Sequence, residues 1–166
     1  GENTSTGTGS VALGRNASAG DYSVALGENA SAEGDSSVAL GENASAEYYS
    51  VALGPGASAG GSSAVALGRD ASAGGDFAVA LGRDASAEGT NSVALGPGAS
   101  TENGSVALGK GASAGEDAVA LGYNTSAENA NEGILGGTGP SHTSTWKVPG
   151  SFTVLGTKNF EIPHPK

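Results

Sequence analysis

The hydrophobic positions along the chain follow one short pattern, Val-Ala-Leu-Gly, which begins at Val11 and returns eight times. Successive copies start 13 or 14 residues apart, and a degenerate copy, Gly133-Ile134-Leu135-Gly136, follows the last of them. A fixed short period is typical of proteins that stack one small unit many times. We therefore predict an all-β solenoid over residues 1–136, built as one body and not as several globular domains.

Each copy has the pattern of a short β-strand, because Val and Leu alternate with smaller residues. Val11 and Leu13 share one face, and Ser10, Ala12 and Gly14 form the other, which stays small and uncharged in every copy. A strand with one wet face normally carries charged or long polar residues there. We expect these Val and Leu residues to form the repeat core or a contact between chains: Val11, Leu13, Val24, Leu26, Val38, Leu40, Val51, Leu53, Val65, Leu67, Val79, Leu81, Val93, Leu95, Val106, Leu108, Val119 and Leu121.

A pair of residues follows each copy, and its second member is always Asn, Asp or Gly. These residues tolerate positive φ, and Pro at the first place of some pairs fixes φ near −65°, so the pair predicts a tight turn with a left-handed second residue. The predicted left-handed positions are Asn16, Asn29, Asn43, Gly56, Asp70, Asp84, Gly98, Gly111 and Asn124.

A second strand, Ala-Ser-Ala in most copies, follows the turn, and three or four variable residues then complete the unit. Alternation predicts that the two Ala point inward and the Ser outward. Ten parallel layers at about 4.8 Å each form a thin rod roughly 45–50 Å long. We expect its interior to contain only Val, Leu and Ala, a core so small that we also predict a homo-oligomer arranged around a rotation axis.

Charge divides the chain into an acidic rod and a weakly basic tail. Residues 1–136 carry four basic and sixteen acidic residues, a balance of −12, whereas residues 137–166 carry three basic residues and one acidic residue, a balance of +2. Binding of nucleic acid needs a basic stripe, so we expect no nucleic-acid partner for the rod. The chain has no Cys and no apolar run of membrane-spanning length, so we expect neither thiol chemistry nor membrane insertion by this chain.

The residues that support catalysis or metal binding are few. Ser141 lies beside His142, but adjacent residues rarely form a catalytic triad and no third orienting group is evident, so we predict no enzyme activity. Acidic loops such as Gly34-Asp35 and Glu116-Asp117 lack the nonapeptide pattern of calcium-binding β-rolls. We therefore predict no cofactor and no metal site, with a surface or packing role for His164.

Aromatic residues are scarce, and most of them fall in the variable loops. Tyr22, Tyr48, Tyr49 and Phe77 lie in loops, and Tyr123 lies in a turn pair. Exposed aromatic side chains on a rigid scaffold serve as binding anchors, so these five are candidate ligand-facing residues. The alternative is that they cover neighbouring coils at the edge of the rod.

The run Ser-Val-Ala-Leu-Gly-x-Asn-Ala-Ser-Ala, repeated over residues 10–127, resembles the head repeat of trimeric autotransporter adhesins, the YadA-like head. This resemblance implies a left-handed parallel β-roll, a homotrimer and an extracellular position on a cell or particle surface. The function it implies is non-enzymatic attachment to host cells, matrix proteins, glycans or another surface.

The resemblance ends after Leu135. A linker-like segment, Gly136-Gly137-Thr138-Gly139-Pro140, precedes a second β pattern around Trp146, and we predict that residues 137–166 form a small trimerisation or connector segment. Its end, residues 156–165, resembles a segment of phage and large-virus fibre proteins. The alternative function is therefore a structural spacer in an extracellular, phage or viral fibre, and a third class, binding of a crystalline surface such as ice, suits the Ser-rich repeat less well.

Overall fold

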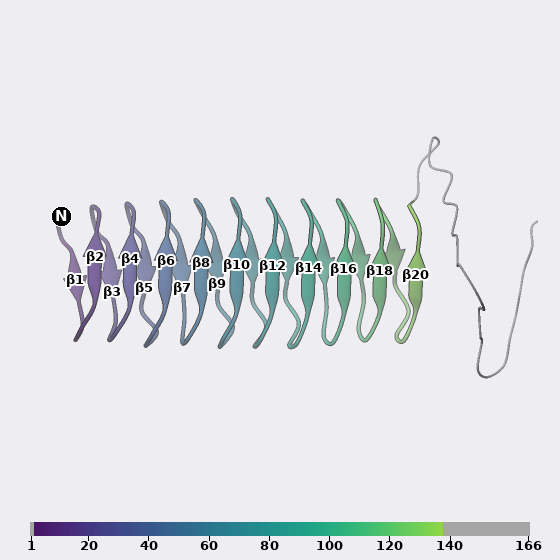
Figure 1. The fold of residues 1–166 in the computed structure, drawn as a ribbon, viewed down its shortest axis with the longest axis horizontal. Coiled ribbons are helices and arrows are strands. Elements are labelled where there is room, and N and C mark those ends of the chain that lie inside the picture. The colour runs from purple at the N-terminus through teal and green to yellow at the C-terminus, as the bar shows by residue number, and fades with distance from the viewer. Residues whose placement is uncertain (1, 138–166) are drawn as a thin grey trace, which may run out of the picture.

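The computed structural model describes residues 2–137, which form a straight stack of coils (Figure 1). Within these residues every regular element is a β-strand, and the strands form two parallel ten-stranded sheets. This confirms the predicted parallel β-solenoid. The predicted tail, with His142, Trp146 and His164, lies outside the described residues except for Gly137.

The Val-Leu sheet contains the even-numbered strands of Figure 1. Its members are β2 (Val11–Leu13), β4 (Val24–Leu26), β6 (Val38–Leu40), β8 (Val51–Leu53), β10 (Val65–Leu67), β12 (Val79–Leu81), β14 (Val93–Leu95), β16 (Val106–Leu108), β18 (Val119–Leu121) and β20 (Gly133–Leu135).

The Ser-Ala sheet contains the odd-numbered strands, each only two residues long. Its members are β1 (Ser5–Thr6), β3 (Ser18–Ala19), β5 (Ser31–Ala32), β7 (Ser45–Ala46), β9 (Ser58–Ala59), β11 (Ser72–Ala73), β13 (Ser86–Ala87), β15 (Ser100–Thr101), β17 (Ser113–Ala114) and β19 (Ser126–Ala127).

The register places each residue type on its own kind. Val65 pairs with Val79 and Ser72 with Ser86, and the same pairing continues along both sheets. The hydrogen bonds run from coil to coil; for example, the Val65 amide donates to the Ala78 carbonyl at 2.9 Å. Each coil therefore holds its neighbours through bonds that lie along the length of the rod.

The two-residue turns have the predicted backbone. All nine second members have φ between 49° and 67°, and several Asn side chains also form a ladder, since Asn16 donates to Asn29 at 3.0 Å and Asn29 to Asn43 at 3.1 Å. Gly is required before each pair because the next coil approaches the backbone too closely for a side chain. At Gly82, with φ +136°, an added Cβ would lie 2.7 Å from the Gly96 carbonyl carbon.

The variable loops contain a second tight turn that the sequence pattern did not predict. Its last residue is also left-handed, as at Ser36 (φ 56°), Ser63 (φ 57°) and Phe77 (φ 58°). The longer coils have one extra bend residue before this turn, which accounts for the alternation of 13 and 14 residues. These residues are Gly34, Gly61, Gly75, Gly89 and Asn129.

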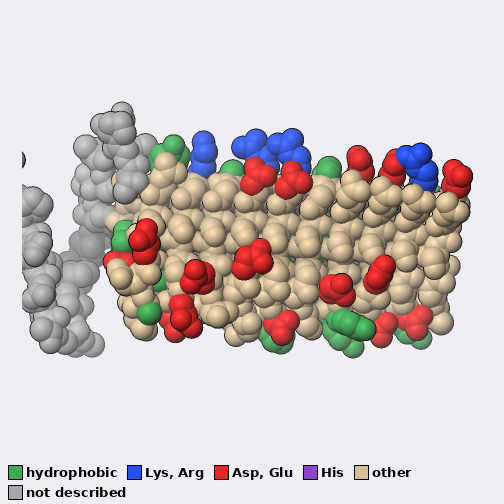
Figure 2. Space-filling model, turned by 180° about the vertical axis from the view of Figure 1, so that it is seen from behind, with side chains coloured by type: hydrophobic (Ala, Val, Ile, Leu, Met, Phe, Trp, Pro, Cys, Tyr) green, Lys and Arg blue, Asp and Glu red, His purple; other side chains and the backbone are tan. Residues whose placement is uncertain are grey.

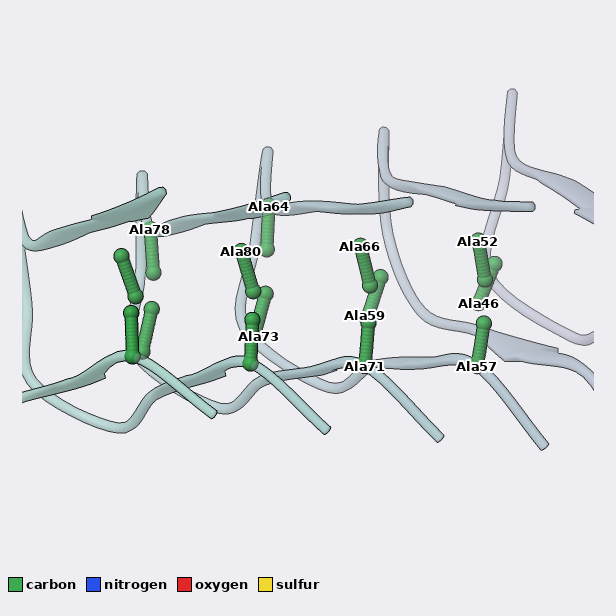
Figure 3. Packing of buried hydrophobic residues seen from close by; sticks show 14 of the residues in the cluster. Ala46, Ala52, Ala57, Ala59, Ala64, Ala66, Ala71, Ala73, Ala78 and Ala80 are labelled. Atoms are coloured by element: carbon green, nitrogen blue, oxygen red, sulfur yellow. The ribbon is translucent and has the colours of Figure 1, made fainter. Parts of the chain in front are cut away.

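The interior consists of alanine methyl groups from both sheets, which point toward one another between the layers (Figure 3). Ala66 and Ala73 are fully buried, as are their counterparts in most coils. The prediction that Val and Leu share this interior is wrong, because both point outward from the Val-Leu sheet and at the N-terminal end Leu13 is 63% exposed. Short turns hold the sheets close together, so small side chains fill the space between them, and Thr101 and Thr125 are the only residues larger than Ala or Ser among the fully buried side chains of residues 2–137.

A line of buried serines closes the interior at the loop side. Ser23, Ser37, Ser50, Ser92 and Ser105 are fully buried, and their hydroxyls donate to loop carbonyls, as Ser37 does to Gly34 at 2.7 Å. These hydrogen bonds satisfy the buried hydroxyls, so no other polar side chain is needed in the core.

Candidate functional site

The rod presents two sheet faces and two edges. We define the turn edge as the residues that lead from a Val-Leu strand to the next Ser-Ala strand, and the loop edge as those that lead from a Ser-Ala strand to the next Val-Leu strand. The Val-Leu face carries a continuous apolar stripe whose side chains are half-buried in the middle of the rod. Such a stripe on a thin rod suits contact with another protein surface.

Three of the candidate aromatic residues occupy equivalent places on the loop edge. Tyr22, Tyr49 and Phe77 are the left-handed residues of alternate coils, 68%, 63% and 60% exposed, with Ser36 and Ser63 between them. Two layers separate neighbouring rings, which corresponds to about 9.6 Å along the rod. A left-handed backbone is unfavourable for large side chains, so the turn geometry does not account for aromatic residues here.

The remaining two candidates differ in position. Tyr48 lies beside Tyr49 on the loop edge and is 56% exposed. Tyr123 lies on the turn edge, where the Lys110 ammonium is 5.8 Å from the centre of its ring, a distance that suits a cation–π contact. The structure thus separates Tyr123 from the other four.

Basic side chains are confined to one of the two edges among the described residues. Among residues 2–137, the turn edge carries all four basic residues, Arg15, Arg69, Arg83 and Lys110. In Figure 2 the Lys and Arg side chains lie along one margin, whereas Asp and Glu side chains also cover the middle of the face and the opposite margin.

The acidic residues are distributed unequally. The turn edge carries five, Glu2, Glu28, Glu42, Asp70 and Asp84, so its balance is 4 − 5 = −1. The loop edge carries eleven and no basic residue among those described, a balance of −11: Asp21, Glu33, Asp35, Glu47, Asp76, Glu88, Glu102, Glu116, Asp117, Glu128 and Glu132. The placement of the basic residues on the turn edge could be read from the sequence, since every Arg and Lys of the repeat is the first member of its turn pair.

Three of the four basic residues on the turn edge make local ion pairs. Arg83 lies 3.1 Å from Asp84, Arg69 lies 3.7 Å from Asp70, and Arg15 pairs with Glu28. All are solvent-exposed, and exposed pairs of this kind contribute little to stability.

The loop edge also has a shallow hollow of about 220 Å³, lined by Glu88, Gly89, Glu102 and Asn103. The Glu88 carboxylate accepts hydrogen bonds from the Ser72 and Ser86 hydroxyls, each at 2.8 Å. In the described part of the chain no group of three or more His, Cys, Asp or Glu residues is gathered to hold a metal ion. Residues 2–137 also include no helix that could cross a membrane.

These features define a repeat protein of the parallel β-solenoid class with an apolar face and two chemically distinct edges. A model of the YadA head domain repeat matches residues 5–21, 18–44, 48–71, 73–99 and 113–131, together more than half of the chain. The chain belongs to this family of YadA-like adhesin heads.

Comparison of structures gives the same fold. The collagen-binding domain of the Yersinia adhesin YadA superposes with a TM-score of 0.54 at 22% sequence identity, covering 88% of this chain and 80% of that chain. No curated protein sequence matches the chain.

Proposed function

We propose that the chain is a non-enzymatic, trimeric adhesion module displayed outside the cell or particle that makes it. The observation that carries this proposal is membership of the YadA head family, whose repeat spans most of the rod. A rod with equivalent side chains at regular intervals can bind a repetitive ligand through many weak contacts acting together.

The Val-Leu face supports the trimer. Its central Val and Leu side chains are only half-buried in the single chain, and the interior behind them is filled by methyl groups alone. Three copies that turn this face toward a common axis bury the stripe and give each thin rod a larger apolar core. The Ser-Ala face then remains outward.

The loop-edge aromatics are the ligand contacts that we propose. Tyr22, Tyr48, Tyr49 and Phe77 supply exposed rings on a rigid edge, and aromatic side chains are frequent anchors in protein interfaces. Since the YadA domain of the same fold binds collagen, matrix proteins are the first ligand class to test. Tyr123 belongs to a separate surface on the turn edge.

The test is attachment of the folded trimer displayed on beads at high density. We expect binding to collagen, to a matrix protein or to a cell-surface glycan, and a loss of at least about tenfold for the triple variant Tyr22→Ser, Tyr49→Ser, Phe77→Ser, because several anchors are removed together. The matched control replaces Ser18, Ser45 and Ser72 with Ala on the Ser-Ala face. Failure of the displayed trimer to bind any of these surfaces would contradict the adhesion function.

The alternative function, a structural spacer in a fibre, is favoured by the uniformity of the rod, whose coils repeat in strict register. In that case the triple aromatic variant keeps full attachment of the whole fibre, whereas deletion of residues 137–166 abolishes assembly.

A further inference from the structure

We propose that the row of aromatic residues on the loop edge binds a linear, β-1,4-linked polymer of glucosamine that lies along the rod, with every second sugar stacked on a ring. The inference rests on the proposed adhesion function and names its ligand. It follows from the spacing of the rings, the small residues between them and the charge of the loop edge.

The rings form a row with a period of two layers. The left-handed residues of six successive coils alternate between small and aromatic side chains, in the order Gly9, Tyr22, Ser36, Tyr49, Ser63 and Phe77. The coils stack in register, so these positions follow a line along the rod on which neighbouring rings are about 9.6 Å apart. Hydrophobic side chains lie at intervals along the margin opposite the Lys and Arg side chains (Figure 2).

The small residues leave room for the rings without covering them. A Cβ added at Gly9 would lie 3.1 Å from Cδ1 and 3.3 Å from Cε1 of Tyr22, so this ring leans over the preceding coil. Ser36 and Ser63 occupy the equivalent places before Tyr49 and Phe77. All three aromatic residues nevertheless remain more than half exposed, so covering a neighbouring coil does not account for them.

A β-1,4-linked chain of pyranose sugars repeats with the same period. Each sugar is flipped relative to the one before it, so the same apolar C–H face recurs at every second sugar, and each sugar adds close to the height of one layer. The electron-rich face of an aromatic ring attracts such C–H groups. Five sugars therefore span the five layers from Tyr22 to Phe77, with the first, third and fifth on rings and the others beside Ser36 and Ser63.

The charge of the loop edge selects a polymer that carries amines. Between residues 20 and 77 this edge has no basic residue, and its acidic residues are Asp21, Glu33, Asp35, Glu47 and Asp76. Asp76 directly precedes Phe77 and accepts the Ser62 amide at 2.9 Å with one oxygen, so its second oxygen can accept a hydrogen bond from an ammonium group. Protonated amines complement these carboxylates and add cation–π contacts to the rings, whereas an anionic glycan is repelled.

A polyproline II peptide is the competing ligand, because one turn of that helix, about 9.3 Å, also fits the spacing of the rings. Such peptides bind in grooves that are walled by aromatic side chains. Tyr22, Tyr49 and Phe77 stand singly on an exposed edge, two layers apart, and do not wall a groove. The row therefore favours the sugar chain, and a proline-rich peptide serves as a control in the test.

Isothermal titration of the full chain with glucosamine oligomers of increasing length tests the proposal. We expect the affinity to rise up to about five sugars and then to level off, because the row spans five layers. Added salt should weaken the binding, since the carboxylates are exposed. Cello-oligosaccharides, which have the same period and no amines, should bind at least about tenfold more weakly.

Two variants test the spacing of the rings. The triple variant Tyr22→Ser, Tyr49→Ser, Phe77→Ser should lose the binding. The double variant Ser36→Tyr, Tyr49→Ser keeps three rings on the row but breaks their period, and it should lose as much affinity as Tyr49→Ser alone, at least about tenfold. Tyr123→Ser on the turn edge is the matched control and should bind as the unmodified chain does. If circular dichroism shows that the double variant does not fold, Ser63→Tyr with Tyr49→Ser repeats the test.

The outcomes separate this ligand from the adhesion function itself. The glucosamine polymer is overturned if its oligomers do not bind, if cello-oligosaccharides bind equally well, or if the triple or double variant keeps full affinity. Binding of a proline-rich peptide that the triple variant loses, without binding of the oligomers, assigns the row to a peptide and overturns it as well. Attachment of the displayed trimer to a matrix protein in these cases leaves the adhesion function standing, whereas failure on every surface removes both.

Discussion

At the scale of single residues, nearly every inward position between the sheets holds one methyl group, and Thr101 and Thr125 are the larger exceptions. Ala87 is fully buried, and the adjacent Ser86 in the same strand, β13, points outward. We expect Ala87→Val to lower the free energy of unfolding by about 1–3 kcal/mol, because the added methyls meet a packed layer. Ser86→Val is the control and should change it by less than about 0.5 kcal/mol. Urea unfolding followed by circular dichroism measures both, and equal effects would contradict the two-faced strand.

Two threonines stand where the repeat has alanine, and they differ in hydrogen bonding. The Thr101 hydroxyl is buried without a partner, whereas the Thr125 hydroxyl donates to the Gly136 carbonyl. We expect Thr101→Val to raise the free energy of unfolding by about 1 kcal/mol, since it removes an unpaired buried hydroxyl at constant shape. Thr125→Val should lower it by a similar amount. Thermal unfolding of both variants checks the opposite signs, and the same sign in both would refute this account.

At the scale of elements, the sequence was sufficient for the strands and the two-residue turns. Alternation identified both strands of each coil, and the Asn, Asp or Gly at the second turn position predicted its left-handed backbone, as at Asn29 and Asp84. These positions are readable because backbone geometry restricts them to few residue types.

The interior and the second turn could not be read in the same way. Larger residues are expected in a core, and this expectation predicts Val and Leu there, but the choice of face depends on the separation of the two sheets, which no single strand specifies. The second turn is formed by residues as different as Tyr22, Ser36 and Asp117, so its shared backbone has no sequence signature. Coil-to-coil hydrogen bonds enforce it instead, such as that from the Phe77 amide to the Ser62 carbonyl at 2.9 Å.

The second turn yields a prediction of its own. Ser63 has φ 57°, a conformation that Asn adopts at lower cost than Ser, whereas Ser62 in the same turn has no positive φ. We expect Ser63→Asn to stabilise the chain by about 0.5 kcal/mol and Ser62→Asn to leave stability unchanged. A matched pair of urea titrations tests this, and a gain for Ser62→Asn alone would argue against the left-handed turn.

At the scale of the whole molecule, the Val-Leu face should control assembly. We expect Leu67→Glu to dissociate the proposed trimer, because a carboxylate enclosed near its axis without a partner costs at least about 3 kcal/mol. Ser58→Glu places the same charge on the opposite face and should leave the trimer intact. Light scattering of the two variants measures the difference, and an unchanged trimer mass for Leu67→Glu would remove this face from the interface.

The direction of the backbone hydrogen bonds has a mechanical consequence. Because the bonds connect coil to coil along the rod, a force that pulls its two ends apart loads the layers in series, and a single chain yields one coil at a time. Release of one 14-residue coil replaces a layer of about 4.8 Å by about 45 Å of extended chain. A particle held by such a rod under flow would move away in steps while its tether stays unbroken. The stack would therefore lengthen under tension and limit the peak force on the attachment.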